Sequence, residues 1–159
     1  MTQKRAMMPG TRFLPELNTE EMHRLLDDVR VGRLGLNDEP QPYIVPTDFG
    51  FKDGLIYIHS PAEGKKTALA RKDPHVCFEV DRYNDDVTEY QSIIIRGDIE
   101  EVLDVAEKRE AMRLMAKKAV RSGGWKAHAN GGTGMGSITV FKIHIKEMTG
   151  IKSPNGGHP

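Results

Sequence analysis

The feature that most constrains the fold of this chain is the short spacing between its central apolar segments. Residues 43–51 and 55–59 are rich in β-branched and aromatic side chains, and only Lys52-Asp53-Gly54, a hairpin sequence, separates them. Two further strand-like segments, 76–80 and 91–99, are joined by a short polar loop. Parallel neighbours need a crossover of about a dozen residues or more. These links therefore favour an antiparallel sheet over a doubly wound parallel one.

Two more segments, 31–36 and 139–146, complete the expected sheet. Apolar residues at helical spacing predict helices over 19–30, 65–72 and 103–120, of which the first opens with a capping box. Pro46 has no N–H to donate, so we expect it to break the strand in which it lies and to sit at an edge or a bulge. The pattern predicts a mainly β (α+β) chain, an antiparallel barrel or sandwich with peripheral helices.

Length and charge predict one domain and exclude several classes of partner. We expect an irregular N-terminal arm over 1–17, a single domain over 18–152 and a disordered tail over 153–159. A net charge of zero argues against nucleic-acid binding and against docking on an acidic membrane. The chain shows no membrane span and no secretory signal, which predicts a cytoplasmic protein. One cysteine excludes an internal disulfide, and we expect no metal site.

The segment from Tyr57 to Lys66 is the best candidate for a binding site. A strand ends at His59, a turn containing Gly64 follows, and a helix begins beside Lys65 and Lys66. Free N–H groups at a helix N-terminus, next to an ammonium, favour a phosphate or another anion. The alternative is a solvated basic turn, because the spacing matches neither a P-loop nor the Rossmann fingerprint. His59 is then either a site residue or a strand-end histidine bonded to the backbone.

Two other side chains have open interpretations. Cys77 lies within an apolar segment, which predicts a buried and unreactive thiol. Trp125 lies in the glycine-rich stretch 121–137, where it either covers a ligand or fills a surface groove.

Several short motifs occur together along the chain: Pro-Tyr-x-Val-Pro at 42–46, Asp-Gly-x-Ile-Tyr-x-His-Ser at 53–60, and Gly-Lys at 64–65 before a helix. Asp-Pro-x-Val at 73–76, Ser-x-Ile-x-x-Gly at 92–97 and the ending Lys-Glu-Met-Thr-Gly-Ile-Lys at 146–152 continue the series. With these motifs the chain resembles the flavin-binding split β-barrel superfamily that includes pyridoxamine 5′-phosphate oxidase. Within it, the chain is most similar to the nitroimidazole-resistance (Nim-type) flavoproteins, over residues 12–152.

The resemblance implies an antiparallel split β-barrel that holds FMN in a groove between two subunits of a homodimer. It places the flavin ring along Val45, Pro46, Thr47, Asp48 and Phe49, and the ribityl phosphate at His59, Ser60, Gly64, Lys65 and Lys66. It also implies that Ser92 contacts the ring or the ribityl chain. Lys65 is expected to be the main phosphate cation, with Lys66, or an arginine such as Arg33, as a second one.

The resemblance further implies an FMN-dependent oxidoreductase that reduces small electrophilic molecules, with NAD(P)H docking transiently in the same groove. It places His59 close to the flavin, where the ring either bonds the phosphate or faces the substrate as a proton donor, the candidate catalytic role. A protein that binds flavin for storage or sensing, without turnover, has the same sequence features. FAD, deazaflavin and heme are alternative cofactors. The substrate-binding arginine and histidine of pyridoxamine 5′-phosphate oxidase have no counterpart near the C-terminus, so we do not expect that reaction.

Overall fold

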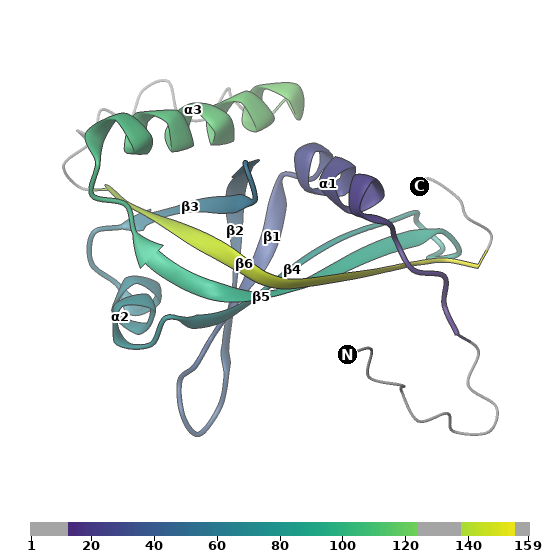
Figure 1. Ribbon diagram of the computed structural model, residues 1–159, viewed down its shortest axis with the longest axis horizontal. Coiled ribbons are helices and arrows are strands. Elements are labelled where there is room, and N and C mark those ends of the chain that lie inside the picture. Colours follow the sequence, from purple (N-terminus) through teal and green to yellow (C-terminus); the bar gives the residue numbers. More distant parts are fainter. Residues whose placement is uncertain (1–12, 124–137, 155–159) are drawn as a thin grey trace.

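The computed structural model describes residues 13–123 and 138–154. Its elements in chain order are α1 (Thr19–Asp28), β1 (Val31–Leu36), β2 (Tyr43–Lys52), β3 (Leu55–Pro61), α2 (Lys65–Lys72), β4 (His75–Tyr83), β5 (Tyr90–Glu101), α3 (Val105–Arg121) and β6 (Ile138–Lys152). The strands form a closed barrel in the order β1-β2-β3-β6-β5-β4 (Figure 1). All neighbouring strands that are paired run antiparallel, which confirms the predicted mainly β barrel with peripheral helices.

The tight turn between β2 and β3 has the conformation that its sequence predicts. Asp53 and Gly54 have φ angles of 53° and 75°, and Lys52 pairs with Leu55. Two successive residues with positive φ are the requirement of a type I′ hairpin, for which an Asp-Gly pair is well suited. This turn places β3 beside β2 and so brings the end of β3 next to the middle of β2.

The expected break at Pro46 is wrong, because β2 continues without interruption from Tyr43 to Lys52. Pro46 pairs with Arg33 of β1, and the Phe49 N–H donates to the carbonyl of Arg30 on the same β1 side. Successive N–H groups of a strand point to alternate edges. The missing N–H of Pro46 therefore falls on the other edge of β2, where it breaks no bond of the β1 ladder.

The last strand, β6, is longer than the predicted segment 139–146. It pairs with β5 along Gln91 to Glu101, with a register shift between Arg96 and Gly97. A bulge of this kind changes which face the side chains take, so the alternating pattern ends there although the strand does not. A Cβ on Gly97 would collide with the His144 carbonyl, which explains the glycine at this position.

Parts of the expected arm and tail pack on the barrel. Leu17 is 5% exposed, and its N–H donates to the carbonyl of Gly150 over 2.9 Å. Ser153 is fully buried, and its N–H donates to Tyr90 over 2.9 Å. Residues 1–12 and 155–159, which make up most of these two segments, lie outside the described residues. Trp125 and residues 124–137 lie outside them as well.

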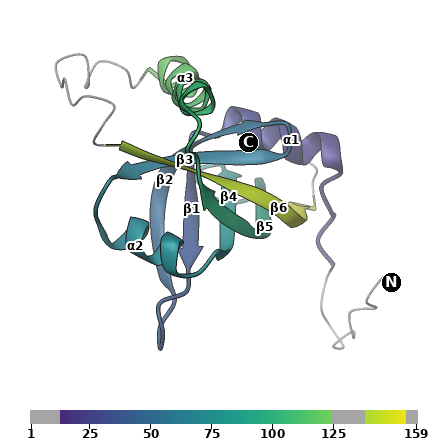
Figure 2. The same cartoon turned by 60° about the vertical axis from the view of Figure 1, so that its left-hand side comes forward.

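Two helices cover one side of the barrel, and α2 lies apart from them (Figures 1 and 2). On α1, Met22, Leu25 and Leu26 are buried at helical spacing, as predicted, and join the barrel core. On α3, Ala111 and Met115 are buried against Tyr57 and Val140 of the barrel wall. No helix within the described ranges is long and apolar enough to cross a membrane.

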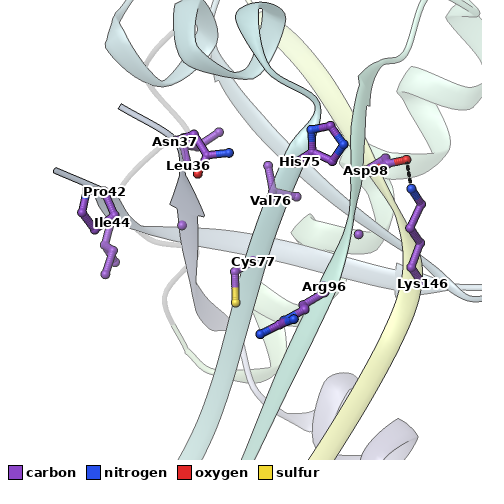
Figure 3. Close-up of a pocket in the computed structure, with 12 residues that line it drawn as sticks. Leu36, Asn37, Pro42, Ile44, His75, Val76, Cys77, Arg96, Asp98 and Lys146 are labelled. Atoms are coloured by element: carbon purple, nitrogen blue, oxygen red, sulfur yellow. Dashed lines mark ion pairs between the residues drawn. The ribbon is translucent and has the colours of Figure 1, made fainter. Parts of the chain in front are cut away.

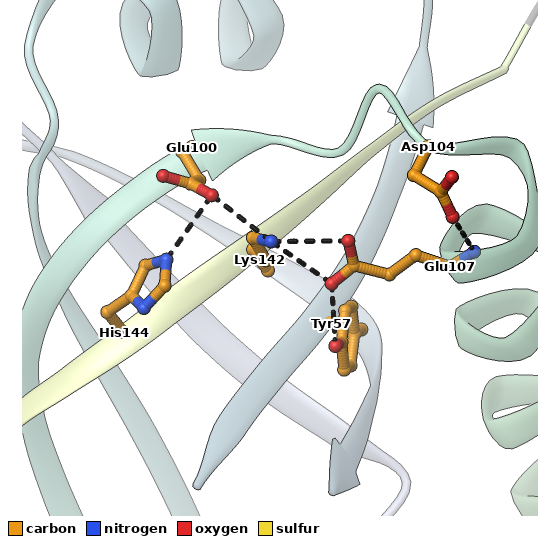
Figure 4. A network of polar contacts seen from close by, with 6 residues as sticks. All are labelled: Tyr57, Glu100, Asp104, Glu107, Lys142 and His144. Atoms are coloured by element: carbon orange, nitrogen blue, oxygen red, sulfur yellow. Dashed lines mark hydrogen bonds and ion pairs between the residues drawn. The ribbon is translucent and has the colours of Figure 1, made fainter. Parts of the chain in front are cut away.

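A polar network fixes the start of α3 to the barrel wall (Figure 4). The Tyr57 hydroxyl donates to Glu107 over 2.9 Å, and the Lys142 ammonium donates to the same carboxylate over 3.1 Å. Lys142 also pairs with Glu100 at 3.2 Å. Because Tyr57 lies on β3 and Lys142 on β6, Glu107 ties α3 to both strands. This attachment sets the position of Met115, two turns further along α3.

Candidate functional site

An open stretch of β2 forms one side of the candidate site. Residues 43–48 pair with β1, whereas pairing with β3 begins only at Phe49. On its β3 side, this stretch has no strand partner within the described part of the chain. Successive main-chain groups of a strand point to alternate edges, and those of Phe49 point to β1. The main-chain groups of Ile44 and Pro46 therefore point toward the open edge. Unpaired main-chain groups of this kind are ready to bond a ligand edge.

The turn from β3 into α2 forms the other side. The Ser60 side chain is 2% exposed, and Thr67 Oγ1 lies 3.0 Å from Ser60 Oγ and 2.9 Å from the Pro61 carbonyl. Gly64 is the N-cap of α2, with φ 147°, and no side chain caps the helix. No atom outside its chain neighbours lies within 4 Å of the position a Gly64 Cβ would take. The first amides of α2 are therefore accessible to an anion.

The two lysines of this turn differ in their surroundings. Lys65 is 57% exposed, its Nζ lies 2.6 Å from Asp38 Oδ2, and it lies 4.9 Å from the centre of the Tyr43 ring. The hydrogen bond with Asp38 raises the pKa of Lys65. Lys66 is half-buried, and its Nζ donates to the His59 carbonyl over 3.1 Å. Burial lowers the pKa of Lys66. The contact of Lys65 with Tyr43 places α2 beside the beginning of β2.

His59 lies between the turn and α3. Its Nδ1 is 3.3 Å from the Met115 sulfur. A thioether sulfur accepts but does not donate, so this contact is a hydrogen bond in the tautomer that carries its proton on Nδ1. Burial is the main cause that lowers the pKa of His59, the positive charge of Lys66 adds to it, and Asp48 opposes it. At neutral pH the ring is therefore uncharged, and Asp48 is near enough to act on it.

Asp48 is held in turn by Arg30. The Arg30 guanidinium donates to Asp48 Oδ2 over 3.1 Å and to the Ser122 hydroxyl over 3.2 Å. Asp48, His59 and Lys66 thus form a group of ionisable side chains at the point where β2 and β3 separate. The predicted residues Ser60, Gly64 and Lys65 lie in the same turn.

The remaining predicted residues do not all face this turn. Phe49 is fully buried in the core and Thr47 is 7% exposed on the same inward side, where Val45 is also partly buried. Their side chains face the barrel interior, and by the alternation of β2 their main-chain groups point toward β1 rather than toward the open edge. Pro46 is on the outward side and exposed. Ser92 lies on β5, which β1 and β4 separate from β2 in the barrel. Its hydroxyl is 3.5 Å from Glu79.

Arg33 is engaged away from the turn. Its guanidinium lies 3.2 Å from Glu79 and 2.5 Å from Asp81, on the outward face of the barrel. The bond with Asp81 is the main cause that raises the pKa of Arg33, whereas burial raises that of Glu79. With two carboxylates on one guanidinium, Arg33 has no excess charge for a phosphate. Within one subunit, Lys65 and Lys66 remain the cations nearest the turn.

A hollow lies on the outward face of the sheet, away from the turn (Figure 3). It has a volume of about 430 Å³, and Figure 3 shows Ile44, Cys77 and Arg96 on its wall and an ion pair between Asp98 and Lys146. The prediction of a buried Cys77 is wrong, since this thiol is exposed. Val76 and Phe78 take the inward positions of β4, so Cys77, between them, points outward.

Sequence reasoning missed three residues of the site. Thr67 braces the turn through Ser60, Met115 contacts His59, and Arg30 holds Asp48. A threonine in the first turn of the 65–72 helix was a usable signal for Thr67. Met115 reaches the site because α3 packs over the barrel, and Arg30 because of the register between β1 and β2. Neither arrangement has a signal in the local sequence. Among the described residues, no group of three or more His, Cys, Asp or Glu side chains is placed to hold a metal ion.

The pattern of one known family, pyridoxamine 5′-phosphate oxidase, matches residues 18–152. The chain belongs to this family. No curated protein matches the chain. The solved structures that are similar include an FAD-binding protein from Mesorhizobium loti, 25% identical, with a TM-score of 0.71, covering 89% of this chain and 99% of that one.

Two further neighbours support the same fold. A provisionally named 5-nitroimidazole antibiotic resistance protein from Bacteroides thetaiotaomicron is 20% identical, with a TM-score of 0.67 and coverage of 92% and 96%. The FAD binding protein from Mycobacterium smegmatis is 22% identical, with a TM-score of 0.64 and coverage of 87% and 97%. At these identities the two likenesses show the fold alone. Together with the family match, they confirm the split-barrel assignment.

The described residues fit the phosphate end of a flavin. The α2 N-terminus has no side-chain cap, Gly64 leaves space above it, and two ammonium groups lie within the same turn. The open β2 edge starts beside this turn and offers main-chain groups to a planar ring. These donors are suited to a phosphate and a heteroaromatic ring.

Proposed function

We propose that this protein binds FMN between the open edge of β2 and the N-terminus of α2, and that it works as an FMN-dependent oxidoreductase that reduces small electrophilic molecules. The observation that carries the proposal is the placement of an uncapped helix N-terminus and two lysines beside the open edge. When bound, the flavin supplies two-electron transfer. Membership of the family supports the flavin, and the nitroimidazole-resistance neighbour suggests nitroaromatic compounds as one class of acceptor.

In this proposal each part of the site has a separate task. The α2 amides and the Lys66 ammonium bind the phosphate, and Lys65 adds charge at the mouth of the turn. Main-chain groups of Ile44 and Pro46 orient the ring edge. His59, with its proton on Nδ1 and uncharged at neutral pH, is placed to hold or pass a proton near the ring. NAD(P)H docks in the same groove, and a cytoplasmic location, where this donor is available, is part of the proposal.

Homodimerisation is a further part of the proposal. The outward face carries Ile44 (66% exposed), Ile94 (42%) and Val31 (39%), together with the hollow of Figure 3. Apolar side chains exposed on one sheet face, beside a hollow, would fit a protein interface. Ser92 is on this face as well, so a two-fold partner seated here would bring its own outward residues toward the groove.

The absorbance spectrum of the freshly purified protein tests the cofactor, and extraction with chromatography identifies it. Flavin absorbance bands, with FMN in the extract, support the proposal. FAD in the extract would support the same binding site with a different cofactor. Absence of flavin, with no uptake of added FMN, would refute it. The same experiment also detects bound deazaflavin or heme.

Turnover is tested separately. The bound flavin should be bleached by NADH or NADPH under anaerobic conditions and regain its colour when a nitroaromatic acceptor is added. A flavin that both donors leave oxidised, or that no acceptor reoxidises, would instead support flavin storage or sensing.

A further inference from the structure

A crevice between α1 and α3 lies away from the turn at residues 59–66. It has a volume of about 290 Å³ and is lined by Asp27 of α1, Phe51 of β2 and Leu114, Lys117, Lys118 and Arg121 of α3. In Figures 1 and 2 both helices lie over the same side of the barrel, while α2 lies apart from them. No step of the proposed flavin chemistry uses this crevice.

Lys118 places a buried ammonium in its wall, and burial lowers the pKa of Lys118 to about 8. The residue is 8% exposed, and its ammonium donates to the carbonyls of Leu26, over 2.5 Å, and Val29, over 3.0 Å. It also lies 3.6 Å from the centre of the Phe49 ring. All these partners are neutral, so no carboxylate bonded to it cancels the charge. A charge in such partly dry surroundings acts more strongly on a nearby anion than an exposed one.

Lys117 and Arg121 add to this charge. They are four residues apart on α3 and so lie on one face of the helix. Neither forms an ion pair with a carboxylate of the described residues, and the only acidic side chain that lines the crevice is Asp27. Three lining cations face one lining carboxylate, and Asp28 also acts on Lys118 from nearby, so a smaller net positive charge remains. An anion is the complement that this arrangement lacks.

The rest of the wall is apolar. Phe51 is half-buried, with its ring centre 5.1 Å from that of His23, and Leu114 packs against the barrel from α3. The volume is at the lower end of the range for small-molecule sites, about 300–1,000 Å³. We propose that this crevice binds a small aromatic carboxylate, whose ring lies on Phe51 and Leu114 and whose carboxylate is held by Lys117 and Arg121.

Benzoate is the probe, and benzamide, a neutral molecule of the same shape, is its control. Calorimetric titration of the full-length protein with its bound cofactor should show saturable binding of benzoate and much weaker binding of benzamide. Each of Lys117→Gln and Arg121→Gln should weaken benzoate binding by about twofold to fivefold, the value of one exposed charge contact. Arg109→Gln removes the same charge from an exposed position of α3 outside the crevice and should leave binding unchanged.

Three results would overturn the proposal. They are the absence of saturable benzoate binding, equal binding of benzamide, and wild-type affinity in both crevice variants. Equal affinity for inorganic phosphate would refute the aromatic part, since phosphate gains nothing from Phe51. Amide shifts on adding benzoate should be largest at Phe51 and Leu114, so shifts confined to the 59–66 turn would also contradict the assignment. The melting temperature of each variant shows that the chain is still folded.

Discussion

The ammonium of Lys66 donates a hydrogen bond to the main-chain carbonyl of His59, which joins the first turn of α2 to the end of β3. The lysine is half-buried there, and burial lowers its pKa. A cation that is partly shielded from water attracts a bound phosphate more strongly than an exposed one. Lys65, in contrast, is 57% exposed and already paired with Asp38. From this geometry we expect the larger contribution from Lys66, whereas sequence alone favours Lys65.

Lys66→Ala should weaken FMN binding by about ten- to a hundredfold, equivalent to about 1.5–3 kcal/mol for a lost charge-assisted contact. Lys65→Ala should weaken it by no more than about fivefold, as for an exposed ion pair. Fluorescence titration of flavin-free protein with FMN measures both. Lys72→Ala, at the other end of α2, is the matched control. Riboflavin lacks the phosphate and should bind all these proteins with similar, weak affinity. If both Lys66→Ala and Lys65→Ala bind FMN with wild-type affinity, the turn is not the phosphate site.

The elements that could be predicted are those with a local cause. Lys52-Asp53-Gly54 specifies its hairpin because two residues with positive φ are needed there, and the capping box at Asn18 and Glu21 forms as expected. The continuity of β2 through Pro46 could not be predicted, because it depends on which edge β1 occupies. The exposure of Cys77 depends on the inward side of β4. The burial of Lys118 depends on how α3 crosses the end of α1, which no short pattern encodes.

Gly64→Ala should destabilise the protein by about 1–3 kcal/mol, because a φ of 147° is outside the range that side-chain-bearing residues adopt readily. There is space for the added methyl group, so the cost comes from the backbone. Urea unfolding of the flavin-free protein measures it. Gly35→Ala is the control, since its Cβ would make ordinary contacts of 3.5 and 3.6 Å with Cys77, and it should change stability by no more than about 0.5 kcal/mol. Equal stability of the two variants would contradict this account of the turn.

His59 should make the protein less stable at mildly acid pH. Its pKa in the folded state is lowered from 6.5 by burial and by Lys66. Below 6.5 the unfolded chain therefore binds a proton more readily than the folded one, so stability falls as pH decreases from 6.5 toward the folded-state pKa. Above 6.5 the contribution is fully present.

Urea unfolding of flavin-free protein between pH 8 and pH 5 tests this dependence, with the pH range chosen to span the ordinary histidine value of about 6.5. His59→Gln should flatten the acid side of the stability profile relative to wild type. A His59→Gln profile parallel to wild type over the whole range would show that this ring does not resist protonation in the folded protein.

The Tyr57 contact with Glu107 should contribute to stability through the attachment of α3. Burial and the nearby carboxylate raise the pKa of Tyr57 to about 12. Tyr57→Phe removes the 2.9 Å bond but leaves the Lys142 ammonium on Glu107, so we expect a loss of about 1–2 kcal/mol. Tyr83→Phe, at a 57% exposed tyrosine, should be neutral. In an alkaline absorbance titration, one tyrosine should ionise near pH 12 and be absent from Tyr57→Phe; an unchanged titration would contradict the assignment.

The proposed dimer predicts a linked change in mass, thiol reactivity and flavin content. Light scattering should give about twice the chain mass of 17.8 kDa. Cys77, the single cysteine, lies on the outward face, so its reaction with a thiol reagent should be slow in the native protein and fast after unfolding. Ile44→Lys puts a charge on this face at a position that is 66% exposed in one subunit, so it should yield folded monomers with a reactive Cys77 and depleted flavin.

Leu103→Lys makes the same change at a 79% exposed position just before α3, and it should leave the dimer intact. Ile44 and Leu103 are both exposed, so neither substitution removes core contacts. Comparing the two variants therefore separates a specific interface from a general effect of added charge. If Ile44→Lys remains a dimer and its Cys77 still reacts slowly with the thiol reagent, a different surface joins the subunits. If both variants dissociate, added charge alone explains the result. Monomers that retain FMN would show that the flavin groove is complete within one subunit, and that α2 and the open edge of β2 suffice to hold it.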